Sequence, residues 1–395
     1  MRGTRSHCIM PAQITNSIPF FVATTAEIVE ISGGYEQSFL VDTEGYLWAT
    51  GKNEEGQLGD NTKQNKKKFG QVAEDAKSVS ASSKYSLMVK TDGSVWATGK
   101  NDNERFGDES DDSGKFIEIV SERAKAVAAG NFHSLMLKTD GSVWATGANN
   151  FYQHGDGSKE AKNKFTKVYP EVDDDGEVQA VFAGGISSYF LKANGSFWAA
   201  GYNEDGRLGD GTGKNVKRFK LVIDGGVKTA SASNFHCMVI KTDGSVLATG
   251  KNNYGQLGID RKDKDDKRYS FEKVLDNGQA VGAGNFHSLV LKRDGSVWAA
   301  GKNQFGELGD GSKTTFDRFV IVAVGAHYIA AGVFNSFIVK TDGSLWAAGR
   351  NDYGQRGDGT TTFRRTFVRL QENFAPFDGA CVLSDRVMHN MHARW

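Results

Sequence analysis

The sequence predicts an all-β fold, a closed seven-bladed β-propeller built from four-stranded antiparallel blades. The first observation is a repeat that occurs seven times: a turn whose second residue is Gly, then a short apolar strand, then Gly-x-Asn. The turn glycines lie 48 to 54 residues apart, at Gly45, Gly93, Gly141, Gly195, Gly244, Gly295 and Gly343. The second observation is composition, with 48 glycines, 11% aromatic residues and only 4 prolines. Repeats of this length, each with a large aromatic residue, are typical of propeller blades.

Each repeat contains four short strands, which the third repeat shows in order. An apolar strand A at 125–130 is followed by strand B at 133–139, where polar and apolar residues alternate as in a half-buried strand. Asp140-Gly141 predicts a two-residue type I′ hairpin turn, and strand C follows at 142–147. After a glycine-rich loop, strand D begins at a phenylalanine, which in successive repeats is Phe69, Phe116, Phe165, Phe219, Phe271, Phe319 and Phe367.

We expect the repeats to close into a ring, because closure removes exposed sheet edges. A solenoid is the alternative, but it requires polar capping repeats, and the terminal repeats here are ordinary. Residues 19–22 align with strand D and give eight such segments for seven places. We expect 19–22 to pair in the last blade beside 328–349, leaving 367–370 outside or competing; the reverse assignment is the alternative. The predicted organisation is an N-terminal extension at 1–18, the propeller at 19–370 and a tail at 371–395.

Charge and cysteine content restrict the function classes. Lys plus Arg number 48, as do Asp plus Glu, so the chain lacks the basic excess that nucleic-acid or anionic-membrane binders need. Cys8, Cys237 and Cys381 have no metal-site spacing and cannot all pair. A reducing, cytoplasmic location is therefore expected over secretion. No run of 18 apolar residues occurs, so no transmembrane helix and no membrane insertion are expected.

We find no catalytic or cofactor motif, and therefore expect no enzyme activity, no cofactor and no bound metal. The sequence has no His-Glu-x-x-His, Gly-x-Ser-x-Gly or Cys-x-x-Cys segment. His133, His236 and His287 occupy the start of strand B, where other repeats have Gln, Tyr, Ser or Asn. Such variation favours hydrogen bonding to the backbone of the neighbouring blade over an axial metal or anion site, which remains the alternative.

Two further residue sets have an architectural interpretation. Strand C carries a tryptophan in six repeats and Leu247 in the fifth, so a large apolar wedge between blades is expected there. The tryptophans are Trp48, Trp96, Trp144, Trp198, Trp298 and Trp346. Six lysines precede the B–C turns, five of them beside a turn aspartate, and these charges are expected to offset one another in solvent. They are Lys90, Lys138, Lys192, Lys241, Lys292 and Lys340.

The A–B and C–D loops emerge on one face of the disk, called here the loop face, and supply the candidate binding residues. Blades 3 and 5 to 7 carry aromatic residues in both loops: Phe132, Phe235, Phe286, Phe334, Phe151, Tyr254, Phe305 and Tyr353. Charged residues of blades 1, 2 and 4 would rim this patch, namely Glu36, Glu55, Lys84 and Asp205. Apolar patches with a polar rim are typical of protein interfaces. The alternative is that each ring folds back onto its own blade.

The repeated segments "AAGNFHSLMLKTDGSVWATG" and "GQLGD" resemble repeats of the regulator of chromosome condensation family over roughly residues 19–370. The resemblance implies a seven-bladed propeller. Members include a nucleotide-exchange factor for a nuclear GTPase, a plant UV-B photoreceptor and a secreted β-lactamase inhibitor, and the last two bind proteins through this loop face. The chain lacks the exchange factor's wedge insertion and basic tail. It also lacks the photoreceptor's tryptophans, having at those positions Tyr35, Ser83, Asn131, Gly185, Asn234, Asn285 and Val333.

The function expected from these observations is non-enzymatic binding of another protein through the aromatic residues of the loop face. Exchange on a small GTPase is one alternative. A ligand- or sugar-binding or enzymatic propeller with an axial site is the other. Fold likeness alone does not choose among them.

Overall fold

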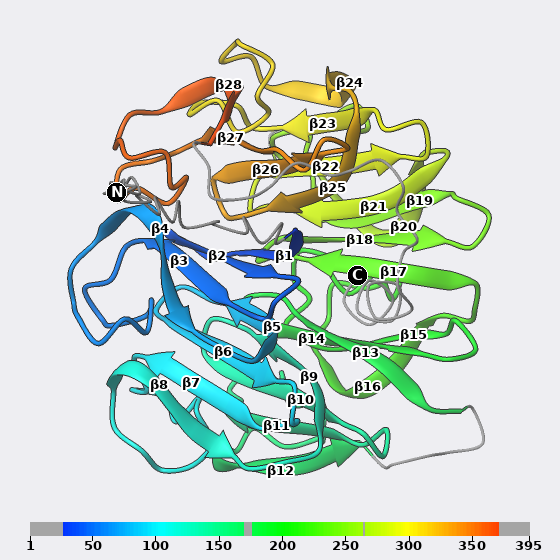
Figure 1. Cartoon of the computed structure of the whole chain (residues 1–395). Helices are drawn as coiled ribbons and strands as arrows, with labels where there is room; N and C mark the ends of the chain where they lie inside the picture. Colours follow the sequence, from blue (N-terminus) through cyan, green and yellow to red (C-terminus); the bar gives the residue numbers. More distant parts are fainter. Residues whose placement is uncertain (1–26, 170–175, 264, 371–395) are drawn as a thin grey trace, which may run out of the picture.

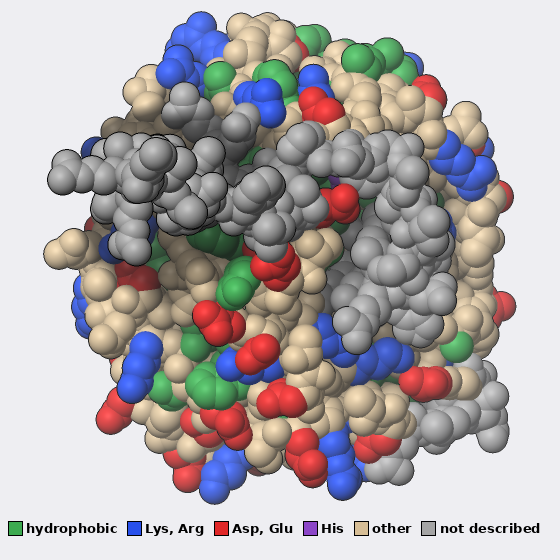
Figure 2. All heavy atoms as spheres, in the orientation of Figure 1, with side chains coloured by type: hydrophobic (Ala, Val, Ile, Leu, Met, Phe, Trp, Pro, Cys, Tyr) green, Lys and Arg blue, Asp and Glu red, His purple; other side chains and the backbone are tan. Residues whose placement is uncertain are grey.

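A computed structural model describes residues 27–169, 176–263 and 265–370, and in it seven four-stranded antiparallel sheets form a ring (Figure 1). Strands follow one another from the inside of each blade to its outer edge, and outer strands such as β8, β12 and β28 lie at the periphery (Figure 1). The predicted all-β propeller with seven blades is therefore confirmed. On the face drawn in Figure 2, basic and acidic side chains are interspersed, in keeping with the balanced charge.

Each blade is one continuous stretch of chain. Blade 1 contains β1 (Ile28–Gly33), β2 (Gln37–Asp42), β3 (Leu47–Gly51) and β4 (Lys66–Ala73). Blade 2 contains β5 (Ala76–Ala81), β6 (Tyr85–Lys90), β7 (Val95–Gly99) and β8 (Ser113–Val120). Blade 3 contains β9 (Ala124–Ala129), β10 (His133–Lys138), β11 (Val143–Gly147) and β12 (Lys162–Tyr169). Blade 4 contains β13 (Val178–Ala183), β14 (Ser187–Lys192), β15 (Phe197–Gly201) and β16 (Val216–Ile223).

The remaining blades repeat the pattern. Blade 5 contains β17 (Val227–Ala232), β18 (His236–Lys241), β19 (Val246–Lys251) and β20 (Lys267–Leu275). Blade 6 contains β21 (Gly278–Ala283), β22 (His287–Lys292), β23 (Val297–Gly301) and β24 (Phe316–Ala323). Blade 7 contains β25 (Ala326–Ala331), β26 (Asn335–Lys340), β27 (Leu345–Gly349) and β28 (Arg364–Arg369). The predicted strand D phenylalanines all lie in outer strands, which begin three or four residues before them.

The ring closes between blade 7 and blade 1, and the expected closure was wrong in one respect. β28 pairs with β27, with Ala347 opposite Val368, so the C-terminal strand D segment completes the last blade. Residues 19–22 lie outside the described residues. The innermost strands β25 and β1 contact each other as those of other neighbouring blades do. The hydroxyl of Tyr328 in β25 accepts a 3.1 Å hydrogen bond from the Ile31 amide, so side-chain contacts join the two blades.

The hairpin between strands B and C also differs from its prediction. In blade 3 the Gly141 amide donates to the Lys138 carbonyl at 3.1 Å, and only Gly141 has a positive φ, of 84°. A type I′ turn requires positive φ at both central residues, whereas a type I turn followed by one left-handed glycine gives a three-residue loop. The Asp140 carboxylate accepts the Ser142 amide at 2.9 Å, which explains the recurring Asp-Gly-Ser sequence.

The core lies between the blades, where strand B and C side chains of one sheet pack on the next. The tryptophans of strand C are half-buried, and each packs against a buried apolar cluster; Leu247 does the same in blade 5. Trp298 of blade 6, for example, packs on a cluster that includes Met238 and Ile240 of blade 5. The wedge prediction is confirmed, with edges of the rings left accessible. Burying these rings is a major apolar contribution to blade packing.

Candidate functional site: the aromatic loop face

The strand B histidines are buried between blades. The Nε2 atoms of His133, His236 and His287 lie 2.9, 2.7 and 3.0 Å from serine hydroxyls of the next blade. The serines are Ser188, Ser288 and Ser336. Each serine in turn donates to a C–D loop carbonyl of the blade it faces, as Ser288 does to Gln256 at 2.6 Å. The expected backbone partner in the next blade is found for Gln37, whose amide donates to the Ser82 carbonyl at 2.7 Å. His287 also makes a backbone hydrogen bond at Asn335 of the next blade. For His133 and His236 the expectation was wrong, because their partner in the next blade is a side-chain hydroxyl.

Burial governs the protonation of these histidines. It lowers the pKa of His133 and His236 to about 3 and that of His287 to about 4, because a charged imidazole loses its hydration between the blades. The three rings do not line the axial cavities. Among the described residues, no group of three or more His, Cys, Asp or Glu side chains is placed to hold a metal ion. The histidines therefore join blades and do not form an axial site.

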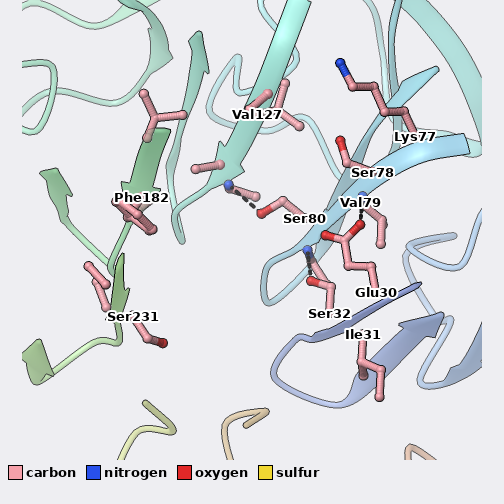
Figure 3. A pocket seen from close by; sticks show the side chains of 18 of the residues that line it. Glu30, Ile31, Ser32, Lys77, Ser78, Val79, Ser80, Val127, Phe182 and Ser231 are labelled. Atoms are coloured by element: carbon pink, nitrogen blue, oxygen red, sulfur yellow. Dashed lines mark hydrogen bonds between the residues drawn. The ribbon is translucent and has the colours of Figure 1, made fainter. Parts of the chain in front are cut away.

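The axial channel is lined by the innermost strands (Figure 3). A cavity of about 210 Å³ occupies it, and a second of about 140 Å³ lies toward the loop face. Ser32 and Ser80 accept backbone amides of the next blade, from Ala81 and Ala129, at 3.0 Å each. Glu30 accepts the Val79 amide at 3.3 Å in the same way (Figure 3). The polar lining thus satisfies the inner sheet edges, which is a structural role.

On the face that carries the B–C turns, called here the turn face, lysines lie over the strand C tryptophans. Five blades have this pair, with the ammonium 4.0 to 4.8 Å from the ring centre. The pairs are Lys90–Trp96, Lys138–Trp144, Lys192–Trp198, Lys292–Trp298 and Lys340–Trp346. We predicted that turn carboxylates offset the charges of these lysines. That prediction was incomplete, because each of the five ammonium groups also stacks on an aromatic ring.

The two loop sets meet on the opposite face, as predicted. In every blade the residue after strand C donates its amide to the A–B loop carbonyl. In blade 6 the Lys302 amide donates to Phe286 at 2.7 Å, and in blade 7 the Arg350 amide donates to Phe334 at 2.9 Å. This recurring bond fixes each A–B loop beside the C–D loop of its own blade. Side chains of both loops are consequently held on the loop face.

Blades 5 to 7 bring their loop aromatics into one continuous cluster. Phe286 stacks on Phe235 at 4.9 Å between ring centres, meets Tyr254 edge-on at 5.2 Å and lies 6.2 Å from Phe334. Phe305 packs on Phe334 at 6.0 Å. Tyr35 of blade 1 and Phe363 extend the cluster, the first on Phe334 and the second on Phe305. We call these seven residues the aromatic sector: Tyr35, Phe235, Tyr254, Phe286, Phe305, Phe334 and Phe363.

The rings of the aromatic sector differ in accessibility. Phe334 is only 9% exposed and supports the others from beneath. Phe235, Tyr254, Phe286 and Phe305 are half-buried. Tyr35 and Phe363 are exposed at the edge. The cluster therefore presents ring edges and faces to solvent while a buried ring holds them in place.

The other predicted aromatic residues lie apart from the sector. Phe132 and Phe151 of blade 3 are 44% and 40% exposed. Phe132 faces the Arg105 guanidinium at 5.8 Å, and Phe151 packs edge-on against Tyr202 at 5.4 Å. Tyr353 of blade 7 lies under the Lys52 ammonium at 4.6 Å. None of these three has a ring contact with the aromatic sector among the described residues.

Of the predicted rim residues, too, only some lie beside the aromatic sector. Glu36 borders the sector, because its carboxylate lies 3.0 Å from the Lys52 ammonium and 3.6 Å from the Arg350 guanidinium. Lys84 of blade 2 is exposed and lies 3.8 Å from Glu55 of blade 1. Asp205 is 6% exposed and pairs with Arg207, so it is not a rim residue.

Sequence reasoning missed the cations that lie over these rings. Lys251 lies 4.6 Å from the centre of Phe235, Lys302 5.4 Å from Phe286 and Arg350 5.3 Å from Phe334. All three directly follow the repeated glycine of strand C, which is Gly250, Gly301 or Gly349. A lysine there in most repeats resembles ordinary repeat sequence, so the alignment alone carries no sign of the stacking.

One acidic residue was also missed. Glu307 is 1% exposed and occupies the place that glutamine takes in four other blades. One carboxylate oxygen accepts the Phe305 amide at 2.7 Å, whereas the other is buried without a hydrogen bond among the described residues. Burial raises the pKa of Glu307 to about 7. The backbone amides of Phe305 and Gly306 and the positive charge of Lys302 act in the opposite direction and lower this pKa.

Comparison with known proteins identifies relatives of this architecture. The sequence matches the RCC1-like domain family over residues 4–320 and the regulator of chromosome condensation (RCC1) repeat over residues 327–355. The solved structure of human WBSCR16 is 18% identical, with a TM-score of 0.73, covering 83% of this chain and 93% of that one. The structure of Prp20p from Saccharomyces cerevisiae, described with its binding to Gsp1p and histones, is 18% identical. Its TM-score is 0.74, and the match covers 84% of this chain and 87% of Prp20p.

A third structure shows yeast RCC1 (Prp20) bound to Kap60, again 18% identical, with a TM-score of 0.73 over 94% of this chain and 90% of that chain. At these identities the likeness shows the fold and not the function.

Within the described ranges there is also no helix long and apolar enough to cross a membrane.

Proposed function

Because the chain belongs to the RCC1-like domain family, we propose that it is a non-enzymatic propeller that binds a partner protein through its aromatic sector. The carrying observation is that six ring contacts join seven aromatic residues from blades 1 and 5 to 7 on one face. A contiguous apolar surface bordered by charges is typical of a protein interface. Solved relatives of similar fold are described with protein partners: Prp20p with Gsp1p and histones, and also with Kap60.

The distribution of the rings around the disk supports this proposal. The same loop positions hold polar or charged residues in blades 1 and 2, including Glu36, Lys84 and Asn103. The fold therefore does not require an aromatic side chain there. Rings that the architecture does not need, yet that gather in one sector, are best explained by a contact made with another molecule. Half-buried rings also lose little conformational freedom on binding, which favours them as anchors.

Phe235 and Phe286 are proposed as the principal anchors, since they stack face to face and remain half-exposed. Tyr254 and Phe305 flank Phe286 and Phe334 respectively. Phe334 supports the cluster from beneath, and Glu36 borders it. Affinity would come from burial of the rings, and selectivity from the surrounding charges.

The test is capture with the immobilised full chain from native extract, followed by cloning of the recovered protein and a direct affinity measurement. Phe235→Ser with Phe286→Ser should weaken binding by at least about 30-fold, the size of one hot-spot loss of 2 kcal/mol or more. Phe132→Ser with Phe151→Ser is the matched control, because it removes two exposed rings of the same face outside the sector. Equal loss in both double variants, or unchanged affinity in the first with an intact circular dichroism spectrum, contradicts the proposal.

A further inference from the structure

The aromatic sector carries a cation at its centre whose surroundings indicate the chemistry of the partner. Lys302 is half-buried and lies 5.2 Å from the ring centre of Tyr254 and 5.4 Å from that of Phe286. Its amide is bonded to the Phe286 carbonyl at 2.7 Å, so the base of the side chain is fixed. The ammonium lies over the rings of the sector.

The neighbouring cations have carboxylates beside them. Lys251 lies 3.4 Å from Asp205, and Arg350 lies 2.5 Å from Asp352 and 3.6 Å from Glu36. For Lys302, by contrast, no ion pair within 4.0 Å occurs among the described residues. Glu307 of the same blade is buried and accepts the Phe305 amide. The sector thus presents one accessible cation among apolar rings.

An ammonium that is partly desolvated by aromatic rings gains more from an incoming carboxylate than an exposed lysine does, because less water screens the pair. A nucleic acid or other polyanion is disfavoured, since Asp352 and Glu36 border the same sector and would repel it. A phosphate group is better matched by several cations or a bidentate guanidinium, and Arg350 is already paired on both sides. A single carboxylate beside an apolar side chain fits the site best.

We propose that Lys302 receives a carboxylate of the partner, so that the bound segment is a stretch of another protein with an Asp or Glu next to an apolar side chain seated on Phe286. This inference rests on the proposed function and names the class of partner. The ring of Phe286 would take the apolar side chain, and the ammonium above it would fix the register by a charge-assisted hydrogen bond.

The probe is a displayed library of random twelve-residue peptides, selected on the purified full chain. Peptides enriched by the unmodified protein are expected to pair an acidic residue with an aromatic or aliphatic one. The strongest is then synthesised in two forms, one with its carboxylates and one with the corresponding Asn or Gln. The acidic form should bind about tenfold more tightly, and 0.5 M salt should remove most of that preference.

Three variants separate the outcomes. Lys302→Met, which keeps the aliphatic stem, should abolish the preference for the acidic form. Lys292→Met is the matched control: it removes the lysine that lies 4.1 Å over Trp298 in the same blade but on the turn face, and it should change the affinity for neither peptide form. Phe286→Ser should weaken both peptide forms.

If Phe286→Ser weakens binding while Lys302→Met keeps the acidic preference, the inference is wrong and the proposed function stands. If neither Phe286→Ser nor Lys302→Met changes binding, or if no peptide is enriched, the inference and the proposed function are both wrong.

Discussion

The two faces of the disk use the same pairing, a cation over an aromatic ring, in different ways. On the turn face it recurs as Lys over Trp in five blades, each time at the same repeat position. On the loop face the rings are confined to certain blades, and those of blades 5 to 7 touch one another. A feature that recurs at one position around the ring belongs to the construction of a blade. A feature restricted to one sector is free of that role, and is therefore the better candidate for function.

The largest expected effect tests the architectural half of this comparison. Trp298→Ala should lower the free energy of unfolding by about 3 kcal/mol, because it removes a wedge between blades 5 and 6. Phe286→Ser in the same blade should cost less than about 1 kcal/mol. Urea unfolding of both variants measures the difference. Similar losses would show that the two faces share one structural role.

Next in size is an acid effect at the blade interfaces. The pKa of His133 is lowered to about 3 in the folded protein, against 6.5 ordinarily, so unfolding favours proton uptake below pH 6.5. The stability that the neutral ring contributes is complete above pH 6.5 and falls as the pH drops toward 3, by about 2 kcal/mol at pH 5. His133→Gln, with the residue that blade 1 uses, should flatten the pH dependence of unfolding by that amount. An unchanged slope would exclude the buried neutral ring.

An effect of similar size and opposite sign is expected at Glu307 beneath the aromatic sector. Its pKa is raised to about 7, so the folded state favours the protonated acid. Its stabilising contribution is complete below the ordinary value of 4.5 and is lost as the pH rises through 7. Glu307→Gln should therefore be more stable than the unmodified protein at pH 8, by roughly 1–3 kcal/mol, and equal to it near pH 4.5. Thermal unfolding of both proteins at pH 4.5 and pH 8 tests this prediction. A stability difference that is the same at the two pH values would contradict a raised pKa for Glu307.

The smallest effect concerns the stacked lysines. Lys292→Met should cost about 0.5–1 kcal/mol, the value of one exposed cation–π contact, and the loss should shrink when Trp298 is already Leu. A double-mutant cycle in urea measures this coupling. A coupling of zero would mean that the lysine merely lies beside the ring.

Sequence reasoning reached the fold because the evidence for it is local and repeated. An Asp-Gly-Ser turn in five blades, a tryptophan in six and a phenylalanine in all seven recur at similar intervals, each at the same place in its blade. The closing strand was assigned wrongly because residues 19–22 and 367–370 carry similar patterns. An alignment of the repeats does not show which of the two segments pairs with β27. The structure shows it, because Ala347 of β27 pairs with Val368.

The candidate site was only partly accessible to such reasoning. Aromatic loop residues could be placed on one face, but whether rings from successive blades touch depends on how the blades are spaced and tilted. That is why Phe286 proved central and Phe132 isolated, although both stand in Asn-Phe-His. Lys302 and Glu307 were overlooked because each differs from the repeat consensus by little or nothing in sequence. Their distinction lies in burial and in what surrounds them.

The most direct test of the central claim is photo-crosslinking from single positions in native extract. Benzoylphenylalanine replaces Phe286 on the loop face or, in a second protein, Lys292 on the turn face. Both proteins are irradiated, and the adducts are identified by mass spectrometry. The account predicts one dominant protein adduct from position 286 that is absent from position 292 and is removed by excess unmodified propeller. The same adducts from both positions, or adducts from position 292 alone, would contradict it.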